Sequence, residues 1–175
     1  QFNYTGRAEI LPFGAFTKKG DYFSADLARE QKPKLAIGVT YDLNMDASRQ
    51  GGKLKKFVTD TSGNPFYRDL STVFVDLIFK YKGFSAMAEY ADKKSDSRIN
   101  DEAINQSLRF RTGTGITFQA GYLFKNNIEV AARYTSITAD ASSSLKDIKE
   151  YKIALSRYVV GHKVKVQSDF GMSET

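Results

Sequence analysis

The sequence predicts an all-β fold, specifically an antiparallel up-and-down transmembrane β-barrel. Three observations favour it. Apolar residues recur at every second position in eight stretches, the connections divide into tight turns and long polar loops, and the other face of each stretch carries charges. The sequence has no run of 18 apolar residues, so a membrane-spanning helix is excluded.

The alternation is clearest in "PKLAIGVTYDLNM" at residues 33–45, where every second side chain from Leu35 to Met45 is apolar. Seven other stretches are strand candidates: "FNYTGRAEIL", "STVFVDLIFKY", "GFSAMAEYA", "SLRFRTGTGITFQAGYLF", "NNIEVAARYTSI", "EYKIALSRYVV" and "HKVKVQSDFGM". Several span roughly ten residues, which is the length that a tilted strand needs to cross a bilayer.

The predicted connections are unequal in a systematic way. Tight Gly or Asn turns are expected at 81–84, 124–127 and 159–162, and long polar outer loops at 46–71, 92–107 and 139–148. In an antiparallel meander all the tight turns would lie at one end and all the long loops at the other, as in outer-membrane barrels. Residues 12–32 break the rule, and "GDYFSADLARE" within them predicts a short helix or a plug-like connection.

Composition limits the function classes. The 175 residues form a single barrel domain or a portion of one, and a mean hydropathy of −0.42 leaves no obvious large apolar core. The absence of cysteine excludes disulfides and thiol nucleophiles. A formal charge of +6 is compatible with nucleic acid, an anionic membrane surface or a small anion, and charge alone does not choose among them.

The charges indicate which face points inward. A packed interior could not hold so many unpaired charges, so we expect the apolar face to meet lipid and the polar face to line a hydrated lumen. The predicted pore-lining basic residues are Arg7, Lys80, Arg109, Arg111, Arg133, Lys152, Lys163 and Lys165. The predicted pore-lining acidic residues are Glu9, Asp42, Asp76, Glu89, Glu129 and Asp169. This small positive excess favours anions.

No enzyme is expected. The only histidine, His162, lies in a predicted turn, and "RTGTG" at 111–115 matches neither of the common phosphate-binding glycine motifs. We therefore predict no catalytic residues, no cofactor and no metal ligands.

The segments "YTGRAEILPFGAF", "KPKLAIGVTYDLN" and "FQAGYLFKNNIEVAARYTSI" resemble the phosphate-selective porin O and P family, in its Bacteroidetes-type outer-membrane form. The resemblance implies a barrel of about sixteen strands, assembled as a homotrimer, with basic residues along the path of an anion. Eight candidate strands would then be about half of the barrel. The ending "DFGMSET" departs from the aromatic residue that usually closes such barrels, so a partial chain is expected.

These observations predict an outer-membrane porin of a Gram-negative bacterium, which allows passive diffusion of small hydrophilic solutes and prefers anions such as phosphate. The expected partners are outer-membrane lipid, lipopolysaccharide and small anions, and no nucleic acid. A structural or interaction barrel remains open as an alternative, either an eight-stranded anchor or a component of a larger envelope complex without significant conductance. A soluble lipocalin-type barrel would need the faces reversed.

Overall fold

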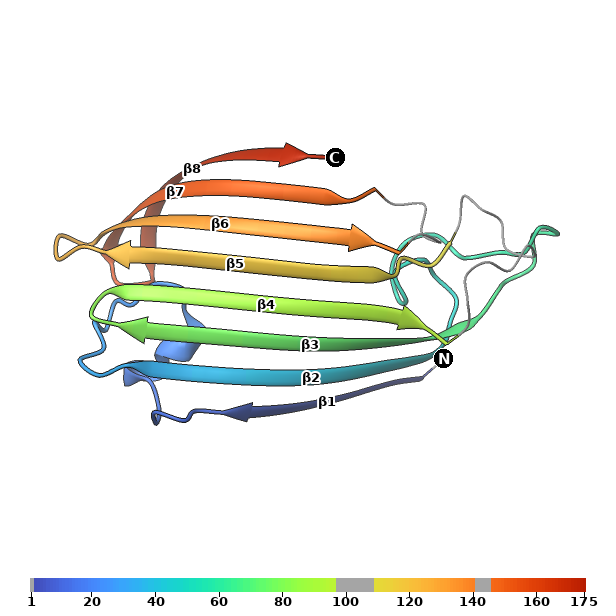
Figure 1. The fold of residues 1–175 in the computed structure, drawn as a ribbon, viewed down its shortest axis with the longest axis horizontal. Coiled ribbons are helices and arrows are strands. Elements are labelled where there is room, and N and C mark those ends of the chain that lie inside the picture. The colour runs from blue at the N-terminus through green and yellow to red at the C-terminus, as the bar shows by residue number, and fades with distance from the viewer. Residues whose placement is uncertain (1, 97–108, 141–145) are drawn as a thin grey trace.

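The computed structural model describes residues 2–96, 109–140 and 146–175 and shows one eight-stranded antiparallel sheet. Its strands are β1 (Phe2–Ile10), β2 (Lys34–Ala47), β3 (Arg68–Tyr81), β4 (Phe84–Ser95), β5 (Gly113–Leu123), β6 (Ile128–Ala139), β7 (Ile148–Val160) and β8 (Val164–Glu174). Each strand pairs with its neighbours in sequence, so the order is β1 to β8 without a crossover (Figure 1). The predicted all-β, antiparallel up-and-down arrangement is confirmed.

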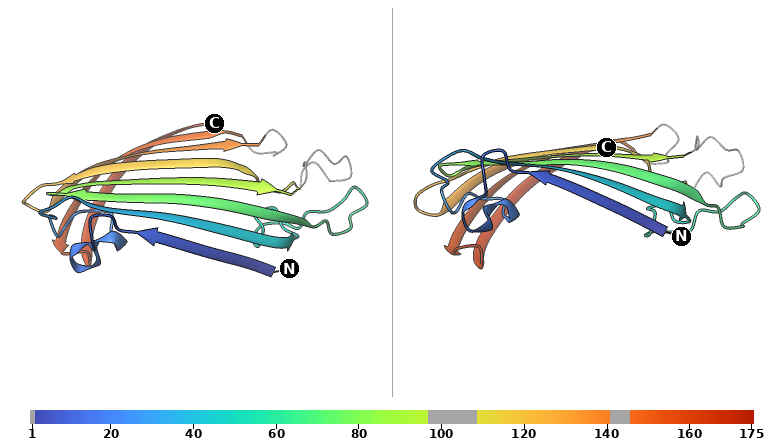
Figure 2. Two further views of the ribbon diagram at one scale, coloured as in Figure 1. Left: turned by 60° about the horizontal axis from the view of Figure 1, so that its bottom comes forward. Right: turned by 90° about the horizontal axis from the view of Figure 1, so that it is seen from below.

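The sheet is curved but not closed. Within the described residues, β1 pairs only with β2 and β8 only with β7, so each edge strand has one unpaired side. Figure 2 shows the sheet arching over the segment that joins β1 to β2, which lies on its concave side. The structure therefore shows a curved wall.

The tight turns, residues 82–83, 124–127 and 161–163, all lie at one end of the sheet, the short-turn end (Figure 1). The longer connection 11–33 lies at this end too, and the loop 48–67 lies at the opposite end, the long-loop end. The loop predicted at 46–71 is shorter in the structure, because β2 continues to Ala47 and β3 already begins at Arg68. Parts of the other two predicted loops, 97–108 and 141–145, lie outside the described residues.

Two strand limits differ from the prediction in a way that moves predicted pore-lining residues off the strands. β5 begins at Gly113 and not near residue 107, because the preceding segment pairs with a loop: the Arg111 N–H donates to the Gln50 carbonyl at 2.8 Å, and Phe110 is fully buried. β8 begins at Val164, since residues 161–163 form the turn. Arg109, Arg111 and Lys163 are therefore not strand residues.

The convex face of the sheet is apolar and exposed. Along β7 and β8 the exposed fractions reach 62% for Ile153, 66% for Val166 and 78% for Phe170. Exposed apolar side chains on the other strands include Tyr4, Val39, Tyr41, Val75, Tyr90, Ile116, Phe118 and Val130. A continuous apolar surface of this extent marks an interaction site in a protein that is otherwise charged.

The buried apolar residues are few and lie at the two ends of the concave face. Ala47, Val58, Leu70 and Phe110, with Phe66 against them, form one cluster at the long-loop end. Ala25, Leu123 and Tyr158, with Leu27, form the other at the short-turn end. The middle of the concave face is left open between them.

No helix among the described residues is long and apolar enough to cross a membrane.

Candidate functional site

The concave face is built from rows of residues that the strand register aligns across the sheet. One row, called the acidic row here, contains Glu9, Gly38, Asp76, Glu89, Thr117, Thr135 and Glu150. The next row toward the long-loop end, the apolar row, contains Arg7, Thr40, Phe74, Ala91, Gly115, Ile137 and Ile148. The next row toward the short-turn end, the basic row, contains Ala36, Ile78, Met87, Gln119, Arg133 and Lys152.

The short-turn end is covered by residues 12–33, called the plug here. The helix predicted at 20–30 is reduced to a single 3-10 element, η1 (Thr17–Tyr22), in which Lys18 and Lys19 have positive φ. The remainder of the segment forms turns that pack on the concave side, where Ala25 and Asp26 are 1% exposed. This part of the chain is a plug-like connection in the described structure.

Buried polar groups hold the plug to β3 and its turn. Lys80, only 1% exposed, donates from Nζ to the carbonyls of Gly20 at 2.7 Å and Ala25 at 2.8 Å. The Asp26 carboxylate accepts from the N–H of Gly83 at 2.8 Å and from the N–H of Glu30. Buried charges are retained only when they are well bonded, so these contacts fix the position of the plug.

On its other side the plug meets β7 and the β7–β8 turn. The Phe23 ring stacks on His162 with 4.0 Å between ring centroids, and Tyr158 meets the same histidine edge-on. The Tyr158 hydroxyl donates to the Glu129 carboxylate at 2.8 Å. Burial against these groups, with the positive charges of Lys80 and Lys165 nearby, lowers the pKa of His162. The lowered pKa favours the neutral form of His162 at this contact.

The loop 48–67 covers the long-loop end of the concave face. Lys93, which the register places on this face, donates from Nζ to the Gly51 carbonyl at 3.3 Å. Val58 of the loop is fully buried against Leu70 and Phe110. The concave face is thus covered at both ends and open between them.

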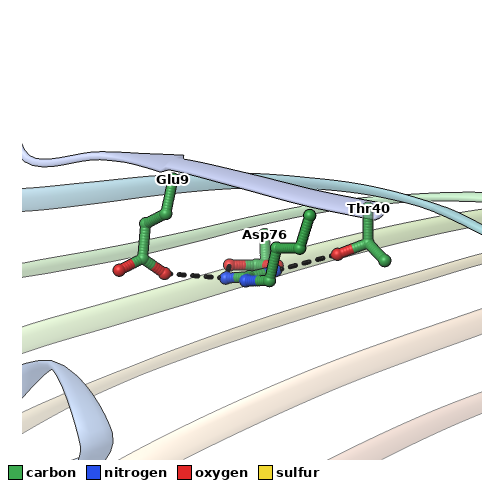
Figure 3. Close-up of polar contacts among 4 residues, drawn as sticks. Glu9, Thr40 and Asp76 are labelled. Carbon is green, nitrogen blue, oxygen red and sulfur yellow. Dashed lines mark hydrogen bonds and ion pairs between the residues drawn. The ribbon is translucent and has the colours of Figure 1, made fainter. Parts of the chain in front are cut away.

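Arg7 is the centre of an ion-pair network on the open part (Figure 3). Its guanidinium donates to both carboxylate oxygens of Asp76, to Glu9 at 2.8 Å and to the Thr40 hydroxyl at 3.1 Å. The network joins β1, β2 and β3, and a two-pronged arginine–carboxylate contact of this kind fixes the geometry of both groups. The guanidinium of Arg7 is therefore occupied by Asp76, Glu9 and Thr40.

Arg133 is held differently. Its Nε and one terminal nitrogen donate to the amide oxygen of Gln119 at 2.9 and 2.6 Å, and no carboxylate of the described residues forms an ion pair with it. It lines a polar hollow of about 180 Å³ with Lys152 and Lys165, in which Ala131 and Ala154 leave room. Lys152 also pairs with Glu150 at 3.1 Å. Glu129 and Asp169 also line this hollow, so its three cations exceed its carboxylates by one.

The other predicted residues take several positions. Asp42 accepts hydrogen bonds from Asn3 and Thr5, Glu89 is exposed in the acidic row, and Asp169 lines the basic hollow. Lys165 lies over the Tyr158 ring at 5.4 Å. The concave face thus brings together Arg7, Glu9, Asp42, Asp76, Lys80, Glu89, Glu129, Arg133, Lys152, Lys165 and Asp169.

Several charged residues of this face were missed from the sequence, among them Lys34, Lys93 and Glu150, although their odd or even position along the strand alone places them there.

In the part of the chain that the structure describes, no group of three His, Asp or Glu residues could hold a metal ion. Comparison with protein-family models, curated proteins and solved structures found no match to this chain.

Proposed function

We propose that this chain forms a wall of an outer-membrane β-barrel that passes small hydrophilic solutes by diffusion and prefers anions such as phosphate. The observation that carries the proposal is the inversion of the two faces. The convex face exposes apolar side chains across the strands, whereas the concave face holds the charges. Lipid outside and water inside satisfy both faces at once, because apolar side chains then leave water and charged ones stay in it.

The openness of the sheet supports a barrel larger than eight strands. Among the described residues β1 and β8 each have an unpaired edge, and unpaired backbone groups are not tolerated at membrane depth. Further strands between these edges would satisfy them. The family resemblance adds a homotrimer in the outer membrane of a Gram-negative bacterium, in contact with lipid and lipopolysaccharide.

The anion preference rests on the hollow of Arg133, Lys152 and Lys165. Arg133 has a neutral amide as its neighbour, so its charge is available to a passing anion. Arg7 contributes nothing comparable, since Asp76 and Glu9 bind it.

Conductance in a planar bilayer tests the proposal with the intact protein extracted in detergent. We expect discrete open steps in chloride that phosphate partly blocks, and a reversal potential under a salt gradient that indicates anions. Arg133→Gln should reduce the block by phosphate, whereas Arg157→Gln, on the exposed other face of β7, should leave it unchanged. Cation selectivity in the wild type, or equal block in both variants, would contradict the anion preference.

A second candidate, a structural or interaction barrel without significant conductance, is favoured by the covering of both ends of the concave face. The plug and the loop 48–67 occupy space that a solute would use. Folded protein that gives no open steps, and still gives none after removal of the plug, would favour this candidate. Its partners would then be other components of a larger envelope complex.

A further inference from the structure

The middle of the concave face contains a second hollow, of about 540 Å³, over β3, β4, β5 and β6. The apolar row forms its floor, where Ala91 and Gly115 are small and stand between Phe74 and Ile137. A Cβ atom added at Gly115 would meet nothing within 4 Å, so the space above the floor is empty. Ile78 and Met87 of the basic row close the other side with apolar side chains.

One carboxylate lies between these apolar parts without a counter-charge. In the acidic row, Arg7 bonds Glu9 and Asp76, and Lys152 bonds Glu150. Glu89 faces the same hollow, is exposed, and has no hydrogen bond or ion pair among the described residues. The Arg7 cluster beside it, with one cation and two carboxylates, adds a net negative charge. Arg133 shares a smaller neighbouring hollow of about 240 Å³ with Glu89 but forms no ion pair with it, and the lining of the larger hollow holds two carboxylates against one cation.

From these contacts we propose that the hollow binds a small organic cation with an apolar body, such as an arylalkyl or alkyl ammonium ion. The ammonium group pairs with Glu89, and the apolar body lies on Ala91 and Gly115 between Phe74 and Ile137. Residues two apart on a strand are about 7 Å from each other, so one molecule has room to place an ammonium group at the Glu89 carboxylate and a ring over Ala91. Burial of the ring and pairing of the charge then act together.

This site differs in charge and position from the basic hollow of Arg133, and it does not depend on conductance. A barrel that passes solutes and one that does not would both contain it. Failure of the binding experiment below therefore leaves the proposed function untouched, and the reverse also holds.

Calorimetric titration of the detergent-solubilised chain with 2-phenylethylammonium tests the proposal. Two further probes separate the contributions: 2-phenylethanol keeps the ring without the charge, and ethylammonium keeps the charge without the ring. We expect 2-phenylethylammonium to bind most tightly of the three. Equal affinity for 2-phenylethanol, or for 3-phenylpropionate, would overturn the proposal.

Variants locate the site. Glu89→Gln should weaken binding of 2-phenylethylammonium about fivefold, the effect of removing one exposed charge pair, and should leave 2-phenylethanol unaffected. Gly115→Leu should fill the hollow and abolish binding of both. The matched controls are Asp169→Asn, a carboxylate beside the basic hollow, and Gly6→Leu, whose added Cβ also meets nothing within 4 Å but lies on the convex face. Controls that weaken binding as much as their partners would overturn the assignment.

Discussion

The short-turn end and the middle of the concave face hold their charges in opposite ways. At the short-turn end, Lys80 is buried and its ammonium group donates to backbone carbonyls of the plug. In the middle, Arg7 and Arg133 remain in contact with solvent, one bound to carboxylates and one to a neutral amide. A basic residue of this face thus stabilises the fold at the short-turn end, whereas in the middle Arg133 keeps its charge in contact with solvent and without a carboxylate partner among the described residues.

The largest effect is expected at Lys80, the buried cation of the short-turn end. Lys80→Met removes the cation among Asp26, Glu30 and Glu129 and leaves two plug carbonyls without their donor. We expect the free energy of unfolding to fall by roughly 3 kcal/mol, because buried carboxylates then lack a compensating charge. Denaturant titration measures this loss, and limited proteolysis should cut residues 12–33 faster. Lys125→Met, an exposed lysine in the β5–β6 turn, should change neither; an equal effect there would refute the anchoring role of Lys80.

A smaller effect is expected at Arg7. Arg7→Gln leaves Glu9 and Asp76 without their shared cation, yet both carboxylates keep contact with solvent. The free energy of unfolding should fall by about 1 kcal/mol, and ion selectivity should shift toward cations. Denaturant titration and reversal potentials measure the two changes. A shift toward anions would contradict the assignment of Arg7 to the network.

The smallest effect concerns pH at the contact of the plug with the β7–β8 turn. The pKa of His162 is lowered in the folded state, so the stability it contributes is present above the ordinary histidine pKa and is lost as pH falls through the lowered value. We expect proteolysis of the plug to become modestly faster on acidification toward pH 5. The change is modest because the histidine is exposed. In His162→Gln the added sensitivity should disappear; an unchanged pH profile would show that another group is responsible.

Much of the architecture could be predicted from the sequence, because the strands and turns of an antiparallel meander depend on residues close together in the chain. Alternation with period two predicted the strands and which side chains share a face, and the tight turns indicated where neighbouring strands end. The structure accordingly has Arg7, Glu89 and Arg133 on one face, as predicted. Odd or even position along a strand carries no information about which side chains on neighbouring strands will contact each other. It could not distinguish Arg7, which lies within reach of Asp76, from Arg133, which lies beside Gln119.

The failures have a common physical cause, namely contacts between segments that are distant in sequence. "SLRFRTG" alternates as a strand does, but Phe110 is buried against the loop 48–67 and the backbone of Arg111 bonds to Gln50. For residues 20–30 the pattern predicted a short helix or a plug-like connection, and could not show that the segment is held by Lys80 and by the N–H of Gly83, which belong to β3 and its turn. The apolar Phe74 and Ile137 on the concave face carried no sequence signal that set them apart from strand residues in general.

The meander has a consequence for the order of assembly. Every strand pairs with its neighbour in sequence, so the sheet can grow hairpin by hairpin through contacts that close short lengths of chain. The plug cannot form its contacts in the same stepwise way. Phe23 packs on His162 and Ala25 on Tyr158, and both partners belong to the last hairpin. Until β7 and β8 are in place, the contacts of the plug at the short-turn end are incomplete, and a partly assembled chain would leave its first connection loose and accessible to proteases.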